Sequence, residues 1–181
     1  GNRTTKMNAE NFNAFTSFNF PLLGKAGINI NYDKTRILKP DFTKSLIPHF
    51  IYDTNVIVLS LFPGIQETIV RHVFSAMELK AIVMRTYGSG NAPQSKWLLE
   101  CIKEATARGV VIVNISQCMS GSVEMSRYET GLQLLEAGVV SGHDSTVESA
   151  VTKLMFLLGH YKDSDTVRYY MNQNLRGEIT I

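Results

Sequence analysis

Three short apolar runs, Val56–Leu61, Ala81–Met84 and Val110–Val113, constrain the fold of this chain more than any other feature. Each run has the length of a β-strand, and its apolar residues follow one another almost without alternation, which is typical of strands buried on both faces. The segments between the runs, 66–77 and 95–108, carry apolar residues at helical spacing. This order of elements predicts an α/β domain in which a small parallel β-sheet is flanked by helices.

Three further helices are expected in the C-terminal part of the chain, over residues 128–137, 145–160 and 164–174. Asp144 or Ser145 would be the N-cap of the second of these helices, and Ser164 the N-cap of the third. Asp144 and Glu148 are one helical turn apart, and paired carboxylates can perform acid–base chemistry. Because both would lie at the start of a helix, where negative charge suits the helix dipole, we favour a capping role.

The first 53 residues have a different character from the rest. Pro21, Pro40 and Pro48 exclude long helices here, and Asn, Phe and Gly are frequent. We therefore predict a lead-in segment over 1–53 and a C-terminal α/β domain over 54–181, with the lead-in less ordered than the domain. The abrupt polar start at Gly1 suggests a chain cut from a longer protein, and a tag remnant before a natural start is the alternative.

Composition argues against several classes of partner. The formal net charge is only +2 over 181 residues and is not clustered, so we expect no nucleic-acid partner and no membrane surface. No apolar stretch reaches the roughly 18–20 residues of a membrane span. The two cysteines, Cys101 and Cys118, stand outside any CxxC or His/Cys cluster, which argues against a zinc site and a disulfide framework. A reducing, cytoplasmic location is expected.

Two loops that leave predicted strands are the candidate binding regions, because ligands of open parallel sheets bind at the carboxyl ends of the strands. In the loop Arg85–Pro93, two glycines let the backbone approach a ligand, and Arg85 could hold a carboxylate. From spacing alone, a tight turn with a solvated arginine is slightly favoured. In the loop Asn114–Gly121, Cys118 would be a nucleophile only beside a base, and no histidine has a suitable spacing, so a structural or ligand-facing cysteine is favoured.

Five motifs, in order, resemble those of bacterial type I (cytoplasmic) L-asparaginases: Gly1–Lys6, Asn13–Phe15, Arg85–Gln94, Asn114–Gly121 and Gln173–Glu178. The resemblance covers nearly the whole chain and is weakest over Tyr32–Asp53. It identifies the chain as similar to the C-terminal portion of such an enzyme. It also implies that residues 1–53, with the Arg3–Lys6 motif, belong with an N-terminal domain outside this sequence.

The resemblance implies hydrolysis of L-asparagine to L-aspartate and ammonia by a cytoplasmic homodimer or homotetramer, with no cofactor. The family's two threonine motifs, of the TGGT and HGTD types, are absent from this sequence. We therefore expect the chain alone to be inactive. Lys6 matches the lysine of the family's Thr–Lys–Asp arrangement and is the catalytic candidate.

Further site residues follow from the same resemblance. Asn91 would contribute to the substrate site of a neighbouring protomer. Thr5, Arg85 and Cys118 would line an allosteric asparagine site between protomers, with Arg85 holding the ligand carboxylate. Arg85 is thus selected both by the resemblance and by its place after a predicted strand.

Two alternatives remain open from the sequence. One is a non-catalytic amino-acid-binding or dimerisation module, which the missing threonine motifs favour for the chain as it stands. The other is the asparaginase-like component of a tRNA-dependent amidotransferase. That component would need a surface facing RNA, which the near-neutral charge does not supply.

Overall fold

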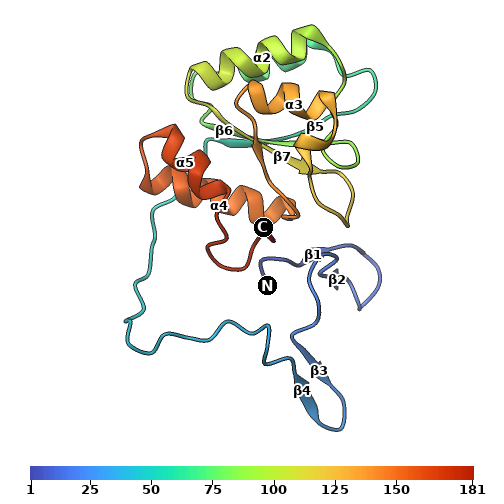
Figure 1. The fold of residues 1–181 in the computed structure, drawn as a ribbon, viewed down its shortest axis with the longest axis vertical. Helices are drawn as coiled ribbons and strands as arrows, with labels where there is room; N and C mark the ends of the chain where they lie inside the picture. Colours follow the sequence, from blue (N-terminus) through green and yellow to red (C-terminus); the bar gives the residue numbers. More distant parts are fainter.

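A four-stranded parallel sheet forms the centre of the computed structural model, which describes all residues from 1 to 181 (Figure 1). Its strands are β5 (Val56–Ser60), β6 (Ala81–Thr86), β7 (Val111–Ser116) and β8 (Val140–Ser141), and they lie side by side in that order. Every neighbouring pair is parallel. The predicted α/β architecture is therefore confirmed. The fourth strand was not predicted, because two residues are too few to form a recognisable apolar run.

Helices cover both faces of this sheet (Figure 1). On one face lie α1 (Glu67–Phe74), α2 (Lys96–Ala107) and α3 (Glu129–Glu136), and on the other lie α4 (Val147–His160) and α5 (Ser164–Met171). A short 3₁₀ turn, Met125–Arg127, precedes α3. Successive side chains of β6 and β7 enter the two cores alternately, with Ile82 in the first and Val83 in the second. None of the helices is both long and apolar enough to cross a membrane.

One prediction about the edge strand β5 was wrong. We expected residues 56–61 to be buried on both faces, but Val58 in the middle of the strand is 45% exposed. The central strands β6 and β7 are buried almost throughout. The reason is position in the sheet, because β5 has a hydrogen-bonded neighbour on one side only.

The predicted caps of the last two helices were also wrong. Thr146, rather than Asp144 or Ser145, caps α4, and its hydroxyl accepts a hydrogen bond from the Ser149 amide at 3.2 Å. Asp163, rather than Ser164, caps α5, and its carboxylate accepts from the Thr166 amide at 2.7 Å. All of these residue types make good N-caps, so composition alone could not choose among neighbours.

The segment before β5 contains two small hairpins. The first pairs β1 (Thr5–Lys6) with β2 (Phe15–Thr16), and the second pairs β3 (Gly24–Ala26) with β4 (Ile30–Tyr32). The first hairpin lies beside the helical domain, whereas the second points away from it, and the chain then returns along an extended path to β5 (Figure 1). Residues 21–52 are almost entirely exposed, so they contribute little to the core.

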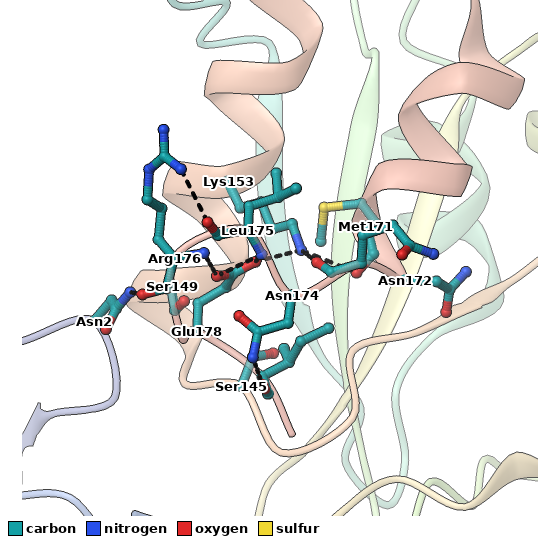
Figure 2. A network of polar contacts seen from close by, with 12 residues as sticks. Asn2, Ser145, Ser149, Lys153, Met171, Asn172, Asn174, Leu175, Arg176 and Glu178 are labelled. Atoms are coloured by element: carbon teal, nitrogen blue, oxygen red, sulfur yellow. Dashed lines mark hydrogen bonds and ion pairs between the residues drawn. The ribbon is translucent and has the colours of Figure 1, made fainter. Parts of the chain in front are cut away.

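A buried ion pair fastens the C-terminal tail to α4 (Figure 2). The Lys153 ammonium lies 2.6 Å from the Glu178 carboxylate, and the two side chains are only 7% and 6% exposed. Lys153 also donates to the Gln173 carbonyl oxygen at 2.5 Å, and Glu178 accepts from the backbone amides of Leu175 and Arg176. The tail is thereby held in a tight loop over the helix.

Replacing Glu178 by Gln should lower the free energy of unfolding by about 3 kcal/mol, because it leaves the buried Lys153 ammonium without its counter-charge. Denaturant unfolding at pH 7 would measure this loss. Glu67→Gln is the matched control. It removes an exposed ion pair to Arg71 within α1 and should cost at most about 0.5 kcal/mol. Equal losses of unfolding free energy for the two variants would contradict a stabilising role of the buried Lys153–Glu178 pair.

The effect of Glu178 should also depend on pH. Burial by itself raises the pKa of this carboxyl group, but hydrogen bonds from Lys153 and the tail amides outweigh it, so the pKa lies below its ordinary value of 4.5. A carboxyl group with a lowered folded-state pKa stabilises the fold above its unfolded-state pKa and loses that contribution as pH falls through the folded-state value. The stability gap between the wild type and Glu178→Gln should therefore be full at neutral pH and shrink in acid below pH 4.5.

Candidate functional site

A cavity of about 290 Å³ lies at the carboxyl ends of β6 and β7. Arg85 and Ser116, near the ends of these strands, form one side of it, and Glu148 at the start of α4 forms another. The third side comes from the N-terminal segment, through Thr5 and Lys6. Ligands of open parallel sheets bind at this edge, so the cavity is the candidate functional site.

Arg85 supplies a cation that no carboxylate of this chain neutralises. Its Nη1 makes one long contact of 3.5 Å with the Ser60 hydroxyl, and its Nε is buried without a hydrogen-bond partner. Buried guanidinium donors normally have acceptors, because losing water without gaining a partner costs free energy. The arrangement suits an anionic group of a ligand that completes the hydrogen bonding of Arg85.

Thr5 and Glu148 contact each other in the lining of the cavity. The Thr5 hydroxyl donates to the Glu148 carboxylate at 2.7 Å, although the two residues are 143 positions apart. Lys6, the next residue of β1, also lines the cavity and is exposed. No ion pair within the chain engages Lys6, so its ammonium is free to interact with groups outside this chain.

A buried arginine holds this N-terminal segment in place. Arg3 is 5% exposed, and its Nη2 lies 2.5 Å from the Asp144 carboxylate, which is 10% exposed. The same nitrogen donates to the Thr180 hydroxyl at 3.1 Å, and the other oxygen of Asp144 accepts from the Thr180 amide at 2.8 Å. One carboxylate thus joins the N-terminal segment, the loop before α4 and the C-terminal tail.

Asn19 makes a second connection between the N-terminal segment and the domain. Its side-chain amide exchanges two hydrogen bonds with the backbone of Gly121, at 3.1 and 2.8 Å, and donates to the Asp144 carbonyl oxygen at 3.2 Å. Gly121 belongs to the loop that carries Cys118. The two ends of residues 1–20 are therefore both fixed to the strand-end loops that form the cavity.

Cys118 lines the cavity with a free thiol. Its backbone amide donates to the Ser116 hydroxyl at 2.9 Å. His143 lines the same cavity, but its imidazole is hydrogen-bonded to Asn172 at 3.4 Å and makes no hydrogen bond to Cys118. The geometry thus provides no base that would make Cys118 a nucleophile, and Cys118 remains a residue of the cavity lining.

Asn91 lies outside this cavity. Its side-chain oxygen accepts from the Thr130 hydroxyl at 2.9 Å, and its backbone pairs with Tyr87 in a tight bridge. Two glycines with left-handed backbone angles, Gly88 (φ 50°) and Gly90 (φ 112°), make this turn possible. The structure therefore brings Thr5, Lys6, Arg85 and Cys118 together and keeps Asn91 apart from them.

A larger hollow, of about 540 Å³, lies between residues 46–52 and α4. It gathers apolar side chains such as Ile47 and Phe156, beside the Lys153–Glu178 pair, and none of the predicted site residues. No group of three or more His, Cys, Asp or Glu side chains in the chain is arranged to hold a metal ion. The cavity at the strand ends is thus the site that four of the five predicted residues share, with Asn91 outside it.

Sequence reasoning missed the roles of Asp144 and Glu148. Both were interpreted as helix-capping groups, but Asp144 precedes the cap of α4 and pairs with Arg3, whereas Glu148 accepts from Thr5. Their partners lie more than 140 positions earlier. The only signal in the sequence was the unusual pair of carboxylates one helical turn apart, which is compatible with both roles.

A family model decides the relationship of this chain to known proteins. The model, described as the glutaminase/asparaginase C-terminal domain, matches residues 55–171. The chain belongs to this family.

The relatives of this asparaginase-family chain have several names. It is 47% identical over 180 residues to L-asparaginase 1 of Escherichia coli (strain K12), covering 99% of the chain and 53% of the relative. It is 40% identical to the human 60 kDa lysophospholipase, covering 99% of the chain and 31% of that protein. It is 37% identical to the L-asparaginase of Thermococcus kodakarensis, covering 99% of the chain and 54% of that protein.

A solved structure agrees with these sequence matches. The crystal structure of L-asparaginase I from Vibrio cholerae superposes with a TM-score of 0.92 at 38% identity, covering 99% of this chain and 54% of that one. The chain spans about half the length of the L-asparaginases that it matches. The resemblance to the C-terminal portion of an L-asparaginase is thus confirmed.

The variant Asp144→Asn should loosen the N-terminal segment without unfolding the domain. It leaves the buried Arg3 guanidinium without its counter-charge, a loss of about 3 kcal/mol for a buried pair. The Met7 amide, which donates to the Ala14 carbonyl oxygen, should then exchange with solvent about 100-fold faster. Amide hydrogen exchange read by mass spectrometry or NMR would measure this.

The matched control for this experiment is Asp165→Asn. Asp165 is 84% exposed and pairs with Arg168 on the surface of α5. Its replacement should leave exchange in residues 1–20 unchanged. The anchoring role of Asp144 would be contradicted if both variants exchanged like the wild type, or if the β6 and β7 amides of Asp144→Asn lost protection as much as Met7.

Proposed function

We propose that this chain is the C-terminal half of a cytoplasmic type I L-asparaginase, which hydrolyses L-asparagine to L-aspartate and ammonia. The cavity at the ends of β6 and β7 is the observation that supports this most directly. Thr5, Arg85 and Cys118 come from three distant parts of the sequence and line one space. The 47% identity to L-asparaginase 1 over 99% of the chain supports the same proposal.

The charges of the cavity suit a free amino acid. Arg85 makes one long side-chain hydrogen bond and no ion pair in this chain, so its guanidinium group is available to an α-carboxylate. Glu148 offers a carboxylate beside the Thr5 hydroxyl, which fits an α-ammonium group. The pairing of one cation and one anion across a cavity of about 290 Å³ supports L-asparagine as an allosteric ligand bound by Thr5, Arg85 and Cys118.

Lys6 is the residue of this chain that we assign to catalysis. A lysine beside a threonine hydroxyl and an aspartate can accept and return a proton as the threonine attacks the side-chain amide. The threonine and the aspartate would come from an N-terminal half. The exposed ammonium of Lys6, with no ion-pair partner in this chain, is available for such neighbours.

Asn91 would act across the interface between protomers of a homodimer or homotetramer. Its turn is rigid, and its side chain is oriented by the Thr130 hydroxyl. A side chain held in this way can be presented to a neighbouring protomer with little loss of conformational entropy on binding. The separation of Asn91 from the cavity supports two distinct sites, one for substrate and one for the allosteric ligand.

One other function is favoured by a specific observation. The cavity brings Arg85, Glu148 and Thr5 of this chain together, so an amino acid could be bound here by a module without catalytic threonines. The name of the lysophospholipase relative suggests a lipid substrate instead. The cavity is lined mainly by polar and charged side chains, which does not suit an acyl chain.

Ammonia release from L-asparagine tests the proposed function. We expect activity from this chain preceded by its upstream coding region and none from the chain alone, because the nucleophilic threonines are absent from residues 1–181. In the extended protein, Lys6→Ala should reduce kcat by at least about 100-fold, the usual contribution of a positioned proton-transfer group.

Lys25→Ala is the matched control, since Lys25 is exposed on the β3–β4 hairpin far from the cavity. It should leave kcat unchanged. If the extended protein releases no ammonia but the chain binds L-asparagine, the proposal of an enzyme is wrong and that of an amino-acid-binding module takes its place. An unchanged kcat in Lys6→Ala would contradict the catalytic role of Lys6.

A further inference from the structure

Two histidines from distant parts of the sequence meet at the C-terminal end of α4. His49 belongs to the segment that leads into β5, and His160 is the last residue of α4, 111 positions later. Nδ1 of His49 lies 3.1 Å from Nε2 of His160, and the two ring centroids are 4.9 Å apart. Neither ring lines the cavity at the ends of β6 and β7, so the proposed function gives this pair no role.

A backbone carbonyl group determines which nitrogen of the His160 ring carries the proton. Nδ1 lies 2.8 Å from the Phe156 carbonyl oxygen, one helical turn earlier. A carbonyl oxygen can only accept, so Nδ1 is protonated, and in the neutral ring Nε2 presents its lone pair toward His49. Histidines that bind a metal ion commonly donate their second ring N–H to a carbonyl oxygen in this way. His160 therefore has the hydrogen bonding of a metal ligand.

The position of His49 is determined by close packing of its segment against α4. The Asp53 amide donates to the Met155 carbonyl oxygen at 2.9 Å. At Gly159 the two backbones come so close that an added Cβ would lie 2.6 Å from the Ile51 carbonyl oxygen. These backbone contacts on the C-terminal side of His49 hold its ring beside the end of the helix.

The separation of the two ring nitrogens matches the distance between two ligands of one metal ion. Zinc binds imidazole nitrogen at about 2.0–2.1 Å, so two such ligands at angles of roughly 90–110° are about 2.8–3.4 Å apart. The observed 3.1 Å lies within that range. His49 also lines the hollow of about 540 Å³ beside α4, which leaves room for water at the remaining coordination positions.

We propose that His49 and His160 form a zinc-binding site that joins the segment before β5 to the end of α4. The ion replaces the proton between the two nitrogens, and that proton moves to Nε2 of His49, which is exposed. Because permanent zinc sites have three or four protein ligands, a site with two binds the ion reversibly. Zinc stabilises the contact between the two segments, since it binds both rings only when they are together.

Isothermal titration calorimetry with zinc chloride near neutral pH tests the site. We expect the affinity for zinc to be at least about tenfold lower in His49→Gln and in His160→Gln, because even the loss of a ligand's hydrogen-bond partner weakens metal binding by about 10–100-fold. His72→Gln is the matched control, since His72 is exposed on α1, on the opposite face of the sheet. It should bind zinc like the wild type.

Gly159→Ala tests whether the fold brings the two ligands together. The new Cβ displaces the backbone at Ile51 from α4 while both histidines remain. We expect zinc binding to weaken by at least about tenfold, as in the histidine variants. Amide hydrogen exchange gives a second readout. With free zinc at about ten times its Kd, the Asp53 amide should exchange about tenfold more slowly in the wild type and at an unchanged rate in His160→Gln.

Several results would overturn the proposal. The two rings do not share an ion if the wild type fails to bind zinc, or if either histidine variant binds it equally well. Wild-type affinity in Gly159→Ala would mean that binding does not need the observed contact with Ile51. Weak binding that all variants have in common would mean an adventitious ion only. Unchanged exchange of the Asp53 amide at saturating zinc would contradict the joining of the two segments.

Discussion

The buried ion pair between Arg3 and Asp144 is the interaction on which the candidate site depends. The N-terminal segment has little apolar surface in the core, so polar contacts must hold it against the domain. Separating two buried charges costs several kcal/mol, which makes one such pair a strong local restraint. Because Thr5 and Lys6 lie two and three residues after Arg3, this restraint helps to place both of them at the cavity.

The rest of the cavity is built on the most rigid part of the molecule. β6 and β7 are the two central strands, with helices on both faces, and their interior side chains are almost fully buried. Arg85 and Ser116 lie where these strands leave the core, so short, well-packed elements fix their backbones. The candidate site thus lies where a well-packed sheet meets a segment held by polar contacts, a common arrangement for binding sites of α/β proteins.

Local sequence patterns predicted the sheet and its helices, because apolar runs and helical spacing are properties of neighbouring residues. The exposure of β5 and the two-residue strand β8 could not be predicted in that way, since they follow from positions in the assembled sheet. Motif resemblance selected Thr5, Arg85 and Cys118. The contacts of Asp144 and Glu148 were missed because their partners, Arg3 and Thr5, are distant in sequence.

Binding of L-asparagine to the cavity is the central claim, and isothermal titration calorimetry of the wild type and Arg85→Lys tests it most directly. A lysine keeps the positive charge but loses the bidentate geometry of the guanidinium. The account predicts measurable binding to the wild type and about tenfold weaker binding to Arg85→Lys, the effect of losing one charged hydrogen bond. Equal affinity in the two proteins, or no binding to the wild type, would contradict it.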